Sequence, residues 1–111
     1  MDESIEFLFE IEKKPNLFVG DDGLIALWHF MNGFIMHQRI SNMRSQKAEE
    51  KAWQFSEYVH TKLNDKRTVS LYRCIVDYTS SDKEAYDLFY HLLHEFYDND
   101  LENNGRNIVN Q

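Results

Sequence analysis

Apolar residues recur at intervals of three and four along most of this chain, and this spacing is typical of amphipathic helices. The first such segment covers residues 4–14, where Leu8 and Ile11 belong to an apolar stripe separated by glutamates. Pro15 follows two lysines, and proline cannot continue a helix. The pattern therefore predicts a first helix over residues 4–14.

A second, broader apolar stripe begins at Leu24 and ends near Met43. Asp21 or Asp22 precedes it, and either aspartate is a suitable helix N-cap. Gly33 lies inside this segment, where glycine lowers helix propensity. We therefore expect another element to pack closely against the helix at Gly33.

Two further segments follow a polar stretch at residues 41–47. Residues 48–63 carry apolar side chains at steps of three and four, which is the clearest helical signature in the chain. Residues 68–79 also carry an apolar stripe, but they are rich in Val, Ile, Tyr and Thr. The pattern leaves helix and strand open for that segment.

The last periodic segment ends at Tyr97. It opens with Ser81 and Glu84 in the spacing of a capping box. Residues 98–111 are polar and asparagine-rich, and we expect them to form a mobile tail. The sequence thus predicts an all-α fold, with one domain of about five helices over residues 1–97 and a polar C-terminal tail over residues 98–111.

Composition supports a single folded domain. The chain has 111 residues, of which 42% are hydrophobic and 14% aromatic, enough for one core. The one cysteine excludes an internal disulfide and a cysteine-rich zinc site. The acidic N-terminus is unlike a secretory signal, and no apolar run approaches the ~18 residues of a membrane span. We expect a cytoplasmic protein.

The net charge of −7 is unevenly distributed. Residues 1–12 contain five acids and no base, and residues 80–104 contain seven acids and one lysine. Residues 36–73 contain eight bases and four acids. An acidic chain disfavours direct binding to nucleic acid and to anionic membranes, and it favours a basic partner. The two acidic ends would form one surface if the first and last helices pack together, although ordinary solvated helix faces explain the same pattern.

The last helix has the most specific pattern. On a helical wheel its apolar residues share one face, and the opposite face carries acids and histidines. A tyrosine stripe runs beside that acidic face, and tyrosine beside carboxylates is typical of a protein-binding surface. Buried packing explains the tyrosines equally well. The candidate partner-binding residues are Tyr86, Asp87, Tyr90, Tyr97, Asp98, Asp100 and Glu102.

Motifs of catalysis are weak. His91, His94 and Glu95 have spacings that would let them approach one metal, but they lack the zinc-protease spacing of two histidines. Cys74 lies in an apolar segment and is typical of a small buried residue. The paired glycines around Asp21 and Asp22 precede a helix without the lysine of a phosphate-binding loop. We therefore predict no enzyme activity, no cofactor and no metal.

The chain resembles small bacterial immunity proteins of polymorphic or contact-dependent growth-inhibition toxin systems. The resemblance covers both ends of the chain and not residues 38–68. The matching motifs are IEFL at 5–8, KKP at 13–15, LFVG at 17–20, LWHF at 27–30, GF at 33–34, SDKEAYDLFY at 81–90 and EF at 95–96.

This resemblance implies a cytoplasmic inhibitor that binds the C-terminal domain of one cognate toxin, often a nuclease. A nuclease needs a cationic cleft for its polyanionic substrate, and an acidic inhibitor could cover that cleft. The alternatives are a non-catalytic helical adaptor or regulator that binds another cytoplasmic protein, and a small metal-dependent enzyme. The oligomeric state and the identity of the toxin stay open.

Overall fold

The computed structural model describes residues 3–14 and 23–109, with side chains for 4–14 and 23–98. Within these ranges there are five helices and no strand. They are α1 (Glu3–Lys13), α3 (Leu24–Ile40), α4 (Gln46–Lys62), α5 (Leu71–Tyr78) and α6 (Asp82–Val109). The predicted all-α fold is confirmed, and the segment left open between helix and strand is the helix α5.

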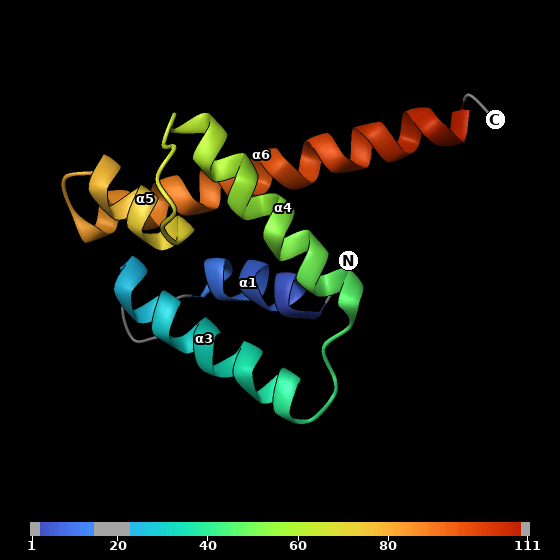
Figure 1. Ribbon diagram of the computed structural model, residues 1–111, viewed down its shortest axis with the longest axis horizontal. Coiled ribbons are helices and arrows are strands. Elements are labelled where there is room, and N and C mark those ends of the chain that lie inside the picture. Colours follow the sequence, from blue (N-terminus) through green and yellow to red (C-terminus); the bar gives the residue numbers. More distant parts are fainter. Residues whose placement is uncertain (1–2, 15–22, 110–111) are drawn as a thin grey trace.

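Helix α6 is the longest element, and three of the other helices, α3, α4 and α5, pack directly against it (Figure 1). Helix α1 lies beside α3, and α4 crosses α6 on the other side of the body. The core contains side chains from all five helices, with Ile11, Leu27, Val59, Ile75 and Leu93 almost completely buried. The helices are therefore held by one shared hydrophobic core.

Short polar side chains begin the later helices, as their sequences favour. The Ser45 hydroxyl accepts a hydrogen bond from the Ala48 amide at the start of α4. Ser81 accepts from the Glu84 amide at the start of α6, so the first half of the predicted capping box is present. The Glu84 carboxylate turns back to the amide of Ser80, one residue earlier than in a standard box.

The start of α3 differs from the prediction. Its N-cap residue is Gly23, and Asp21 and Asp22 lie outside the described residues. An acceptor for the first turn comes from a distant segment instead, because the Asp82 carboxylate accepts a hydrogen bond of 3.0 Å from the Ile25 amide. This contact joins the beginnings of α3 and α6.

Asparagine ends both α3 and α4. Asn42 and Asn64 have φ values of 56° and 52°, in the left-handed region. At the end of α3 the Met43 amide donates to the Gln38 carbonyl and Asn42 to Arg39. The same two-bond pattern follows α4, and it defines a Schellman motif at each end. Helix α3 therefore stops at Ile40, three residues before the predicted end.

The environment of Gly33 contradicts the expected close packing. This glycine is exposed, and a Cβ built on it would meet no atom within 4 Å. No element in the described part of the chain therefore requires a glycine at this position, where glycine lowers helix propensity.

Helix α6 is longer than its apolar pattern. Residues 98–109 continue α6 as a helix up to Val109 (Figure 1), and residues 110 and 111 lie outside the described part. A polar sequence indicates that a segment is not buried, but it does not prevent the backbone hydrogen bonds of a helix from continuing. Helix α6 therefore continues twelve residues beyond Tyr97, the last residue of its periodic apolar pattern.

Candidate functional site

Helix α6 has one buried and one exposed face along its described side chains. Ala85, Phe89, Leu92 and Leu93 point into the core. The exposed face carries the acids and histidines that the helical wheel placed opposite. We call this set the α6 acidic face: Glu84, Asp87, His91, His94 and Asp98.

The three tyrosines are not part of that exposed surface. Tyr86, Tyr90 and Tyr97 are 6%, 3% and 7% exposed. The Tyr90 hydroxyl donates a 2.7 Å hydrogen bond to the Leu8 carbonyl, and burial raises the pKa of Tyr90 well above its usual value. The Tyr97 ring packs edge-on against Phe9. The expected exposed tyrosine stripe is therefore absent, because neighbouring helices cover α6 on its flanks as well as on its apolar face.

The two described aspartates of the candidate site share one side of α6. Asp87 and Asp98 are both exposed, and eleven residues correspond to three helical turns, about 16 Å. The Asp87 carboxylate lies 2.9 Å from the Lys83 ammonium, and both side chains are well exposed. The backbones of Asp100 and Glu102 belong to α6, but their side chains lie outside the described set.

The first and last helices are in contact at one point. Glu12 Oε1 of α1 lies 2.7 Å from His94 Nε2 of α6. The Phe9 ring lies 4.8 Å from the His94 ring, measured between centroids. The end of α1 therefore lies against α6 at His94, and Glu12 borders the α6 acidic face.

The three groups considered for a metal do not converge on one point. His94 faces Glu12, whereas His91 Nε2 lies 3.5 Å from Glu95 Oε2. Glu95 also binds Lys62 at 2.7 Å and accepts a hydrogen bond from Tyr58, and these contacts lower the pKa of its carboxyl group. Among the side chains that the structure describes, no group of three or more metal-ligand residues is close enough to hold an ion. Glu95 instead connects α4 to α6.

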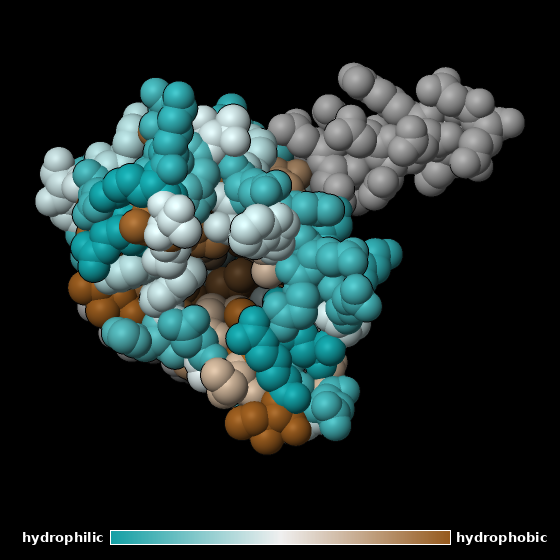
Figure 2. All heavy atoms as spheres, in the orientation of Figure 1, coloured by the Kyte–Doolittle hydropathy of each residue, from teal (hydrophilic) through white to brown (hydrophobic). Residues whose placement is uncertain are grey.

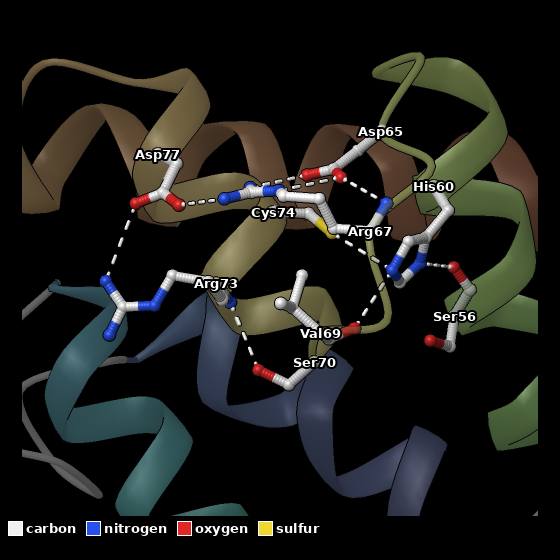
Figure 3. A network of polar contacts seen from close by, with 9 residues as sticks. All are labelled: Ser56, His60, Asp65, Arg67, Val69, Ser70, Arg73, Cys74 and Asp77. Atoms are coloured by element: carbon white, nitrogen blue, oxygen red, sulfur yellow. Dashed lines mark hydrogen bonds and ion pairs between the residues drawn. The ribbon is translucent and has the colours of Figure 1, made fainter.

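A second polar cluster connects α4, α5 and the loop between them (Figure 3). His60 Nδ1 lies 2.8 Å from the Ser56 carbonyl oxygen, and its Nε2 lies 2.9 Å from the Val69 carbonyl oxygen. The same Nε2 is 3.2 Å from Cys74 Sγ. No sequence pattern indicates this pair, because His60 and Cys74 are on different helices and fourteen residues apart.

This cysteine–histidine pair lacks the properties of a nucleophilic site. Cys74 is 2% exposed, and burial together with the nearby Asp65 carboxylate raises the pKa of its thiol to about 11. A reactive cysteine needs an accessible thiolate. Arg67 binds both Asp65 and Asp77 and holds the pKa of Asp65 well below its usual range. We interpret the cluster as a structural connection between α4 and α5.

No family model, curated protein or solved structure matches this chain. The class of this protein is therefore described from its structure alone. It is a single all-α domain whose longest helix exposes acids and histidines. None of the described helices combines the length and the apolar composition that a bilayer span requires.

Proposed function

We propose that this chain is an immunity protein whose α6 acidic face covers the cationic active-site cleft of a cognate nuclease toxin domain. The observation that supports this most is that Asp87 and Asp98 are both exposed on one side of α6, where Glu12 of α1 contacts His94. The resemblance of both chain ends to immunity proteins supports the same function.

The electrostatics fit a fast-binding inhibitor. The net charge of −7 attracts a basic partner over a distance of about a Debye length, ~8 Å at physiological salt. The carboxylates of Asp87 and Asp98 lie on a helix that is fixed in the core, so little backbone freedom is lost on binding. The buried tyrosines hold that helix in place, and the contact itself is made by carboxylates.

The test is protection of cells from the toxin domain encoded directly upstream of this chain. Cells that express the toxin domain should grow when the wild-type chain is present. The double variant Asp87→Lys/Asp98→Lys should lose protection, because two attractive charges become repulsive. The matched control is Glu50→Lys/Glu57→Lys, which reverses two exposed charges on α4 and should protect fully.

Equal protection by both double variants would show that the toxin-binding site is not on the α6 acidic face. No protection by the wild-type chain would refute the immunity function itself. Circular dichroism of each purified variant shows whether it is folded.

A helical adaptor is the second candidate, and an exposed apolar patch favours it. Met36, Ile40 and Met43 are 51%, 75% and 62% exposed at the end of α3. Hydrophobic atoms are visible over this end of the molecule in Figure 2. Exposed apolar patches often mark protein-binding surfaces. The gene of an adaptor would not lie beside a toxin gene. The variant Ile40→Asp would lose binding to the adaptor's partner protein, whereas Asp87→Lys/Asp98→Lys would keep it.

A further inference from the structure

A pocket opens between α4 and the α1–α3 pair, and Figure 2 shows hydrophobic side chains at the floor of a central hollow. Met31 and Ile35 of α3 form one wall, Ala48 and Ala52 of α4 form the opposite wall, and Leu93 of α6 lies among the remaining lining residues. The small alanine side chains leave space that larger side chains would fill. Ala52 is exposed and so lies at the mouth.

The one charged side chain among the described lining residues is already engaged. Arg44 borders the pocket with its side chain only 3% exposed. Its guanidinium donates to Glu49 and Gln38 at 3.0 and 3.1 Å, and it makes longer contacts of 3.3 and 3.4 Å with the Ser4 hydroxyl and the Ala48 carbonyl. A carboxylate entering the pocket would therefore lose its hydration without gaining a strong new partner.

The size of the pocket also restricts the ligand. Its volume is about 140 Å³. An enclosed apolar protein cavity of about 150 Å³ stays free of water and binds benzene. This pocket has nearly the same volume, but it has a mouth at the exposed Ala52. We propose that this pocket is a binding site for a small neutral apolar molecule about the size of one aromatic ring. This inference does not depend on the proposed immunity function.

The test uses toluene as the probe and the full chain labelled with ¹³C at methionine and alanine methyl groups. Toluene should shift the methyl resonances of Met31, Ala48 and Ala52 with a dissociation constant of about 1 mM or tighter. Benzoate has the same ring with a charged group, and it should bind at least tenfold more weakly. Shifts confined to Met36 and Met43, or equal binding of the two probes, would overturn the proposal.

A variant that fills the pocket distinguishes toluene binding inside the pocket from non-specific toluene binding. Ala52→Leu places a larger side chain at the mouth and should reduce toluene binding at least tenfold. Gln54→Leu adds the same side chain at an exposed position of α4 outside the pocket, and it should bind toluene as the wild type does. If Ala52→Leu does not fold, Ile35→Phe fills the pocket from the opposite wall. Undiminished binding by a folded filling variant contradicts the proposal.

Discussion

Two arginines share Glu49, and they differ sharply in burial. Arg39 binds the Glu49 carboxylate at 2.7 and 2.9 Å with its side chain 52% exposed. Arg44 binds the same carboxylate at 3.0 Å with its side chain 3% exposed. The pair allows the effect of burial to be measured separately from the effect of the ion pair.

The expected cost of Arg44→Ala follows from the groups that it leaves behind. Gln38 is 5% exposed, and the variant removes the contact of its side-chain oxygen with the guanidinium. A buried polar group that loses its partner costs about 1–3 kcal/mol. With the lost packing of the aliphatic stem, we expect Arg44→Ala to lower the free energy of unfolding by about 3–5 kcal/mol. Arg39→Ala should lower it by only about 0–1 kcal/mol.

Urea unfolding followed by circular dichroism at 222 nm measures the free energy of unfolding of both variants. The comparison is valid if this free energy falls with urea concentration at the same slope in both. The reasoning is refuted if Arg44→Ala costs less than about 1 kcal/mol, or if Arg39→Ala costs as much as Arg44→Ala.

Three further predictions concern helix ends, helix propensity and pH. Gly33→Ala should raise the free energy of unfolding by about 0.5–1 kcal/mol, because the added methyl group meets no atom; a lower value in urea unfolding would contradict this. Because φ is positive at Asn64, Asn64→Gly should leave the free energy of unfolding unchanged or raise it, whereas Asn64→Ala should lower it by about 1 kcal/mol. Equal thermal midpoints for the two variants would count against a Schellman motif at this position. The pKa of Glu49 lies below its ordinary value of 4.5, mainly because the carboxylate accepts a hydrogen bond from Arg39. The ionised Glu49 therefore stabilises the fold above pH 4.5, and this stabilisation is lost as the pH falls through the pKa of Glu49 in the folded state. Urea titrations should therefore show that Glu49→Gln is destabilising at pH 7 and that the difference narrows below pH 4.5; a constant difference would contradict the argument.

Helix periodicity predicted the fold well because each helix has a continuous apolar stripe. The clearest case is α4, whose steps of three and four begin at Ala48 and end at Leu63, close to the observed bounds. Local signals were also reliable where they are self-contained, as with the Ser81 hydroxyl that accepts from Glu84. These features depend on neighbours within about four residues, and a sequence displays such neighbours directly.

Features that depend on distant partners could not be predicted. Arg44 lies in a polar stretch that looked like an ordinary loop, yet residues from α1, α3 and α4 bury it together. The contact of His60 with Cys74 likewise depends on how α5 docks against α4. Tyr90 and its neighbouring tyrosines were ambiguous because a helical wheel shows the direction of a side chain but not how many helices surround it.

The central claim is that the α6 acidic face binds a cationic cleft, and isothermal titration calorimetry against the purified upstream toxin domain tests it most directly. The wild-type chain should bind with an affinity that falls as salt rises from 50 to 500 mM, whereas Asp87→Lys/Asp98→Lys should bind at least a hundredfold more weakly at low salt. Binding of that variant with wild-type affinity, or an affinity that does not change with salt, would contradict the account.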